Sequence, residues 1–136
     1  MDRSALNAEL IRDEGLRLRP YLDSVGKLTI GVGRNLDDVG ISNAEALTML
    51  ANDVDLAIHE LESRFTWFGD LSDARQRVLV NMCFNLGITR LLGFRNMLAA
   101  VELGDYYKAA HEMLDSKWAR QVGDRAKRLA TMMEQG

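Results

Sequence analysis

Three polar side chains near the start of the chain have types and spacing suited to acid–base chemistry. Glu14 and Asp23 are carboxyl residues nine positions apart, and Thr29 follows six positions later. A carboxyl group can donate a proton to a leaving group, and a carboxylate with a nearby hydroxyl can hold a water molecule. Cutting a glycosidic bond takes a similar combination, with an acid on one side of the bond and a second carboxylate on the other. Pairs of carboxyl residues are common in proteins. The helix or strand that carries each residue therefore decides whether the pair can act together.

Glu14 is expected in the last turn of a short helix that is capped by Ser4 and ends at Gly15. The apolar residues of this helix share one face: Leu6, Leu10 and Ile11. A carboxylate in the last turn meets the negative end of the helix dipole, at a cost of a few tenths to about 1 kcal/mol. The same field favours the protonated carboxyl, which a general acid needs. An exposed Glu without a role fits the same position.

Asp23 and Thr29 are expected on one face of a small hairpin. Residues 17–23 and 27–33 alternate between apolar and polar side chains, and residues 24–26 form the turn. The alternation places both residues on the face away from the core, where they could hold a water between them. Turn chemistry is the alternative for Asp23, because Asp commonly accepts a backbone hydrogen bond two residues on. Gly31 and Gly33 either make room for a polymer or reflect hairpin twist or a bulge.

The rest of the chain is predicted to be helical. Ser42 to Glu45 fits a capping box, and a helix of about twenty residues follows it. Shorter helices are expected from Ser72 to Gly87 and over residues 94–103, 106–115 and 124–134. The fold class is therefore α+β, mostly α: a short helix, a hairpin, a long helix and a bundle of four or five helices. A small β lobe joined by one helix to a helical lobe leaves a cleft, where ligands commonly bind.

Composition narrows the classes of function. The 136 residues are 47% hydrophobic and 27% charged with a net charge of −3, which indicates one globular domain and argues against a nucleic-acid binder. One Cys and two His cannot form a disulfide or a four-ligand zinc site, and we expect no metal or cofactor. Cys83 is predicted to be a buried, inert thiol. No apolar run reaches the length of a membrane span, and the first residues lack the apolar region of a signal peptide, so we expect no membrane insertion and a cytoplasmic location.

Charge is spread unevenly along the sequence. Residues 37–73 carry nine acidic side chains and one basic one, whereas residues 74–101 carry four arginines and no acid. The acidic stretch is typical of the solvated face of a helix. The basic stretch is either another solvated face or a surface for an anionic polymer.

Several motifs, taken in order, resemble the phage-type lysozymes of glycoside hydrolase family 24. The first block runs from Asp13-Glu14-Gly15-Leu16-Arg17-Leu18 through Tyr21-Leu22-Asp23 to Leu28-Thr29-Ile30-Gly31-Val32-Gly33. Later blocks are Asn81-Met82-Cys83-Phe84-Asn85-Leu86-Gly87, Gly93-Phe94 with Asn96, and Ser116-Lys117-Trp118 to Asp124-Arg125-Ala126-Lys127-Arg128. The resemblance spans nearly the whole chain. One departure is Arg34, which stands where the family has a His, so any ion pair of that His must be altered.

The resemblance implies roles for individual residues. Glu14 would be the general acid, and Asp23 and Thr29 would position and activate the attacking water in an inverting hydrolysis. Arg125 would support catalysis by pairing with Glu14 from the helical lobe. The positions that would contact substrate are Asn35, Phe84, Met97 and Glu112. The substrate would be the β-1,4 bond between N-acetylmuramic acid and N-acetylglucosamine in peptidoglycan.

The resemblance also implies a biological setting. We expect a monomeric endolysin with one domain over residues 1–136. Its β-hairpin lobe would lie at about 15–41, and its helical lobe would consist of residues 62–136, approximately, together with the N-terminal helix. It would wait in the host bacterial cytoplasm until a separate holin-like membrane protein gives it access to the cell wall. Two alternatives remain: a lytic transglycosylase on the same bond, and a non-catalytic peptidoglycan-binding or structural protein with a lysozyme fold.

Overall fold

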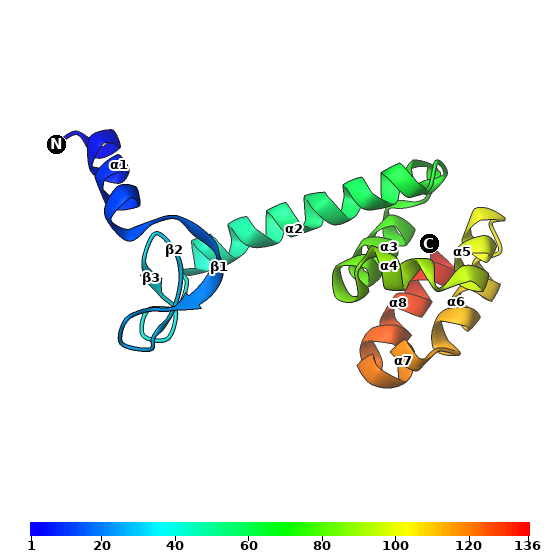
Figure 1. Ribbon diagram of the computed structural model, residues 1–136. Helices are drawn as coiled ribbons and strands as arrows, with labels where there is room; N and C mark the ends of the chain where they lie inside the picture. Colours follow the sequence, from blue (N-terminus) through cyan, green and yellow to red (C-terminus); the bar gives the residue numbers. More distant parts are fainter. The chain divides into compact units, whose positions relative to one another are not determined.

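The computed structural model describes all residues, 1–136, and divides them into two compact units (Figure 1). The N-terminal unit is Met1–Thr48 and the C-terminal unit is Met49–Gly136. The boundary falls inside the long helix α2 (Asn43–Arg64), which was predicted at about this length. The prediction that the first helix belongs to the helical lobe stays a prediction.

The N-terminal unit begins with helix α1 (Arg3–Glu14). Its N-cap is Asp2, whose Oδ1 accepts a hydrogen bond from Ala5 N at 3.0 Å, so the predicted cap at Ser4 is wrong. Asp and Ser are comparable caps, and the sequence alone does not separate them. The helix ends at Gly15 as predicted, where the glycine N–H donates to Ile11 O at 2.8 Å.

A three-stranded antiparallel sheet follows in the order β1 (Arg17–Leu22), β2 (Leu28–Gly31) and β3 (Arg34–Asn35). The hairpin is confirmed, but its third strand was not predicted because two residues show no alternation. The pairing between β1 and β2 shifts between Arg17 and Tyr21, where β1 carries extra residues. This bulge breaks the expected alternation. Leu18 is 84% exposed, whereas Thr29, expected on the open face, is buried.

Helix α2 starts with the predicted capping box, which also binds the preceding strand. Ser42 N donates to Glu45 Oε1 at 2.9 Å, and Glu45 N donates to Ser42 Oγ at 3.1 Å. Arg34 Nη1 donates to the same Glu45 oxygen at 2.9 Å and to Gly40 O at 3.1 Å. The Arg34 hydrogen bond, followed by those from Ser42, lowers the pKa of Glu45 from 4.5 to about 2. The arginine at this position therefore has an ion pair within its own unit.

The C-terminal unit is a bundle of short helices after the one-turn helix η1 (Phe68–Asp70). The predicted helices are confirmed as α3 (Asp73–Leu86), α5 (Arg95–Glu102), α6 (Tyr106–Leu114) and α8 (Asp124–Gln135). Two more, α4 (Ile88–Leu92) and α7 (Lys117–Val122), exceed the predicted number. Each is too short for a 3.6-residue period to be recognised. No helix of the chain combines the length and apolar character needed to cross a membrane.

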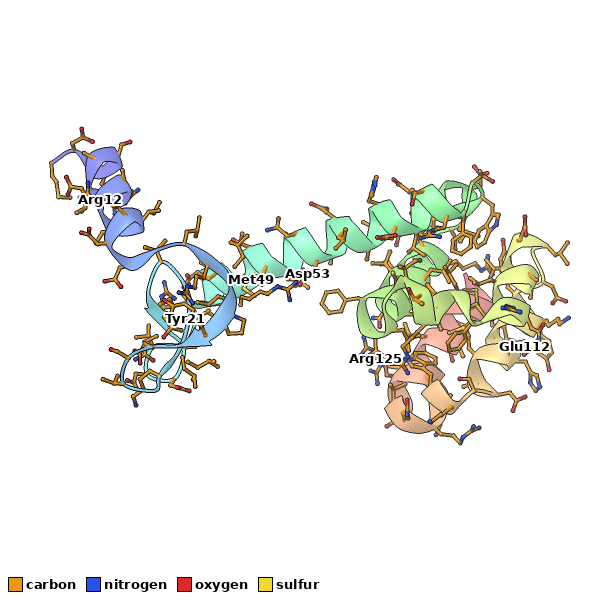
Figure 2. The ribbon with its side chains drawn as sticks, in the orientation of Figure 1. Arg12, Tyr21, Met49, Asp53, Glu112 and Arg125 are labelled. Carbon is orange, nitrogen blue, oxygen red and sulfur yellow. The ribbon has the colours of Figure 1, made fainter.

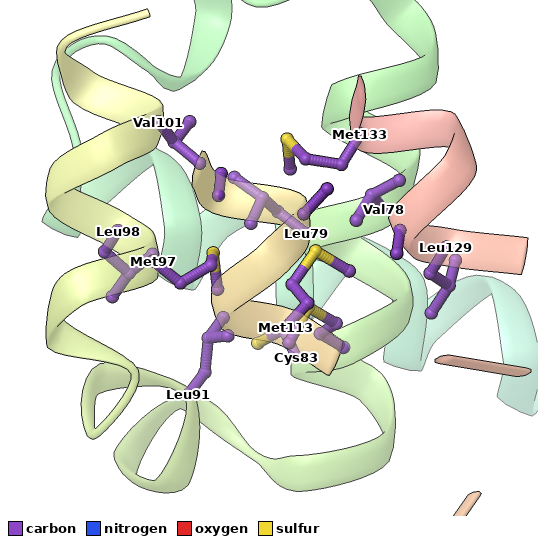
Figure 3. Packing of buried hydrophobic residues seen from close by; sticks show 14 of the residues in the cluster. Val78, Leu79, Cys83, Leu91, Met97, Leu98, Val101, Met113, Leu129 and Met133 are labelled. Carbon is purple, nitrogen blue, oxygen red and sulfur yellow. The ribbon is translucent and has the colours of Figure 1, made fainter. Parts of the chain in front are cut away.

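The apolar core lies within the C-terminal unit (Figure 3). Helix α6 packs against α5 and α8, and α3 packs against α8. The largest fully buried side chains are Leu61, Val78, Leu79, Met82, Leu91, Met97, Val101, Met113 and Met133. Cys83 is buried among them as predicted, and burial raises the pKa of its thiol. The architecture is α+β and mostly helical, as the sequence indicated.

Candidate active site

Glu14 occupies the predicted place, the last residue of α1. Its side chain is exposed, and within the N-terminal unit it makes no hydrogen bond or ion pair. It lies over Gly33, because a Cβ at that glycine would come within 2.9 Å of Glu14 Oε2. The bare face of Gly33 is thus covered by the Glu14 carboxyl, and a polymer would have to share it. The carboxyl is therefore open to a bound molecule.

Asp23 accepts backbone hydrogen bonds in the turn after β1, which was one of its two expected roles. Its Oδ1 accepts hydrogen bonds from Val25 N at 2.9 Å and from Lys27 N at 2.8 Å. These bonds hold the turn between β1 and β2 and fix the direction of the carboxylate. The second oxygen, Oδ2, accepts no hydrogen bond within the N-terminal unit. One oxygen of Asp23 is therefore structural, and the other is available for chemistry.

The side chain of Thr29 and the backbone of Asp23 bond to the same carbonyl oxygen. Its Oγ1 donates to Lys27 O at 2.8 Å, and Asp23 N donates to the same oxygen at 2.9 Å. The backbone of Lys27 therefore bonds to Asp23 twice, its N–H donating to Asp23 Oδ1 and its carbonyl accepting from Asp23 N, and the same carbonyl accepts from Thr29 Oγ1. The side-chain pattern of the sequence contains no signal for this backbone role.

The hydrogen bonds that Thr29 and Asp23 already make limit the further hydrogen bonds that each side chain can form. The hydroxyl proton of Thr29 is committed to Lys27 O, so the Thr29 oxygen can act only as an acceptor toward another molecule. Asp23 Oδ2 is likewise an acceptor. A water that donates one hydrogen to each of them keeps its lone pairs for attack on an electrophile. This arrangement suits a nucleophilic water and a carboxylate base.

Asn35, a predicted substrate contact, lies in β3 and has a partly committed amide. Its Nδ2 donates to Asp38 Oδ2 at 3.0 Å, and its Oδ1 accepts from Asp38 N at 2.9 Å. One N–H and one lone pair of the amide remain for a ligand. Lys27 Nζ reaches the other oxygen of Asp38 at 3.2 Å, so the amide is held in a fixed orientation.

In the C-terminal unit, Phe84 and Arg125 line one groove of about 900 Å³ between α2, α3 and α8. Phe84 is 47% exposed, and its ring can stack on an apolar face of a ligand. Arg125 donates from Nε and Nη2 to Asn81 Oδ1 at 2.9 and 2.8 Å. Asn81 thus orients the guanidinium, a role that the sequence reasoning missed although Asn81 opens one of the motifs. The positions of Arg125 and Glu112 in the C-terminal unit can be followed in Figure 2.

Met97 and Glu112 line a different pocket of the same unit, of about 430 Å³. Met97 is 1% exposed and its side chain points into the core (Figure 3). It therefore offers almost no surface to a sugar in this structure. Glu112 is half-buried on α6 and presents a carboxylate. Nearby, Trp118 Nε1 donates to Asn85 Oδ1 at 2.8 Å. Asn81 and Asn85 of α3 therefore both contact the last motif, which contains Trp118 and Arg125.

Comparison with known proteins identifies the family. The family described as phage lysozyme matches residues 12–134, a range that includes every candidate site residue. The chain belongs to the phage lysozyme family. It is 27% identical to "Probable T4-type lysozyme 1" of Dictyostelium discoideum, over 98% of this chain and 95% of that protein. It is 30% identical to the "Pre-baseplate central spike protein Gp5" of Enterobacteria phage T4, where 95% of this chain spans 28% of the relative.

Membership in the phage lysozyme family makes the protein a lysozyme-type glycoside hydrolase whose substrate is peptidoglycan. Among the predicted residues, the structure brings Asp23 together with Thr29, Phe84 with Arg125, and Met97 with Glu112.

Proposed function

We propose that this phage lysozyme hydrolyses the β-1,4 bond between N-acetylmuramic acid and N-acetylglucosamine in peptidoglycan, as an endolysin that lyses the host cell at phage release. Family membership supports the substrate class. The observation that supports the reaction type is the unequal use of the two Asp23 oxygens: Oδ1 accepts two backbone hydrogen bonds of the turn, whereas Oδ2 accepts none within the N-terminal unit and is the base in this proposal.

In the proposed reaction, Glu14 is the general acid and gives its proton to the leaving glycosidic oxygen. The water oxygen attacks the anomeric carbon from the opposite face as the carbon–oxygen bond to the leaving sugar breaks. A proton of that water passes to Asp23 Oδ2, and Thr29 Oγ1 accepts a hydrogen bond from its other hydrogen. Attack opposite the leaving group inverts the configuration of the anomeric carbon.

The proposed substrate contacts come from residues of both units. Asn35 offers one N–H and one lone pair, and Phe84 offers an exposed ring. Glu112 offers a carboxylate that can accept from sugar hydroxyls or amides. Met97 is proposed to contact substrate beside Glu112, with which it lines one pocket. Arg125, oriented by Asn81, is proposed to pair with Glu14 and to hold it in place until substrate binds.

The proposed setting is a monomer that acts in the periplasm after a separate membrane protein lets it leave the host cytoplasm. Expression in bacteria with and without a co-expressed pore-forming protein tests this setting. Lysis only with the pore supports it, and lysis without the pore contradicts the dependence.

A second candidate setting is favoured by the similarity to a phage spike protein, in which a region of this size is part of a longer chain. In that setting the same hydrolysis would open the cell wall from outside the cell, on a virus particle. Association of the protein with purified particles would favour the spike setting, and its presence only in the soluble fraction of infected cells would favour the endolysin.

The experiment that tests the proposed function is a turbidity assay on bacteria with a permeabilised outer membrane. We expect the protein to clear the suspension and Glu14→Gln to reduce the rate by the 10²–10⁴ typical of general acid catalysis. Glu9→Gln, the same change at another exposed carboxylate of α1, is the matched control and should keep the normal rate. Clearing by Glu14→Gln at a tenth of the normal rate or better would contradict the assignment. No clearing by the unmodified protein would favour the non-catalytic alternative.

A further inference from the structure

Two glycines lie where β2 leads into β3, Gly31 at the end of β2 and Gly33 in the turn, with nearly the same φ and different surroundings. Gly31 has φ +70° and Gly33 has φ +69°, a region that other residues adopt only under strain. A Cβ added at Gly31 would meet no atom within 4 Å. A Cβ added at Gly33 would lie 2.9 Å from Oε2 and 3.2 Å from Cδ of Glu14. Backbone conformation explains both glycines, and Gly33 has a second reason to lack a side chain.

The contact involves the carboxyl group of Glu14 itself. The three atoms of Glu14 nearest to a Cβ at Gly33 are Oε2, Cδ and Cγ, at 2.9, 3.2 and 3.4 Å. Within the N-terminal unit no hydrogen bond or ion pair fixes this carboxyl, so its packing over the glycine is the contact that gives it a direction.

A side chain at residue 33 would move the carboxyl rather than the hairpin. The turn is flanked by the antiparallel pairs Ile30–Arg34 and Thr29–Asn35, and Leu36 N donates to Leu28 O at 2.7 Å. The end of a glutamate side chain, by contrast, reaches other positions by rotation about single bonds. The carboxyl therefore gives way first.

We propose that Gly33 is a positioning residue for the general acid: its missing side chain provides the surface against which the Glu14 carboxyl rests, and so sets where the proton is delivered. The inference rests on the proposed role of Glu14. A displacement of about 1 Å at a reacting group can cost on the order of 10²-fold in rate. The expected signature is a loss of kcat with little change in substrate binding.

The test compares Gly33→Ala with Gly31→Ala, which introduces the same backbone strain without the contact. Both variants should melt within a few degrees of each other. On soluble, uncrosslinked peptidoglycan chains, kcat of Gly33→Ala should fall at least tenfold below that of Gly31→Ala, with KM changed less than threefold. In a Glu14→Gln background the two alanine variants should have equal residual rates, because the positioned proton is already gone.

Equal kcat values for Gly33→Ala and Gly31→Ala would overturn the inference, as would a tenfold difference that persists in the Glu14→Gln background. Full activity of Glu14→Gln alone would instead overturn the proposed function. In that case the contact is tested by the carboxyl ¹³C resonance of Glu14, which should move in Gly33→Ala and stay in Gly31→Ala. If Gly33→Ala does not fold, adding Glu14→Ala should restore folding, and failure of that double variant while Gly31→Ala folds would overturn the inference.

Discussion

Asp23→Asn separates the two roles of Asp23 atom by atom. An asparagine keeps a carbonyl oxygen that can accept from Val25 N and Lys27 N in place of Oδ1, at the 2.9 and 2.8 Å of the native bonds. Its amide nitrogen replaces Oδ2 and cannot take a proton from water. The turn should therefore persist while the base is lost.

The two effects of Asp23→Asn differ in size. Hydrogen bonds to a charged acceptor contribute roughly 1.5–3 kcal/mol and those to a neutral one about 0.5–1.5 kcal/mol. Because the side chain is partly exposed, we expect a loss of stability of about 1 kcal/mol, or roughly 3–5 °C in melting temperature. Loss of the base should reduce kcat by about 10²–10⁴, which is roughly 3–5 kcal/mol in the barrier.

Thermal melts and kcat on soluble peptidoglycan chains measure both effects in one preparation. Asp37→Asn is the matched control, since Asp37 Oδ2 also accepts a backbone N–H of this hairpin, from Leu28 at 2.7 Å. That control should lose similar stability and keep its activity. If Asp23→Asn keeps more than a tenth of the native kcat, Asp23 is a turn residue and the reasoning from Oδ2 is refuted.

Three further predictions test other parts of the account. Thr29→Glu places a carboxylate where the water is proposed to bind, and should block turnover and trap a covalent sugar adduct visible by mass spectrometry; native activity would remove this residue from the site. Arg125→Ala should lower kcat, because it removes the proposed partner of the general acid, and Asn81→Ala should lower kcat by less, because it removes only the group that orients Arg125; unchanged kcat values would refute the proposed pairing. The pKa of Glu45 is lower in the folded chain than its ordinary 4.5, so its contribution to stability is complete above about pH 4.5 and is lost as pH falls toward about 2. Glu45→Gln should flatten the stability curve in that window, and an unaltered curve would contradict the effect of Arg34.

Local signals in the sequence were sufficient at two helix ends and one capping box, but not at the start of α1, where Asp2 and not Ser4 is the cap. Gly15 and Gly87 end their helices, and Ser42 with Glu45 forms the capping box. The long helix needed only its spacing of apolar residues. The bulge in β1 could not be predicted, because it depends on pairing with another strand, and Leu18 and Leu22 of β1 are exposed where an apolar buried face was expected.

The site was predictable as a set of residue types, but its working atoms were not. The spacing of Glu14, Asp23 and Thr29 pointed to the chemistry through a family resemblance. The roles of the two oxygens of Asp23 follow from the turn between β1 and β2, where Oδ1 accepts from the backbone N–H groups of Val25 and Lys27, and no side-chain pattern encodes these bonds. Met97 was predicted at the substrate; the structure places it in α5 at 1% exposure, beside the pocket that Glu112 also lines, and its contact with substrate stays a prediction.

The reaction products distinguish hydrolysis of the proposed bond from the alternatives. Purified peptidoglycan is digested with the protein, the new ends are reduced with borohydride, and the fragments are identified by mass spectrometry. Hydrolysis at the proposed bond predicts reduced N-acetylmuramic acid at every new end, with one oxygen of ¹⁸O-labelled water incorporated per cut. Fragments that carry a 1,6-anhydro ring and no label, or reduced N-acetylglucosamine ends, would contradict hydrolysis of that bond by a water held between Asp23 and Thr29.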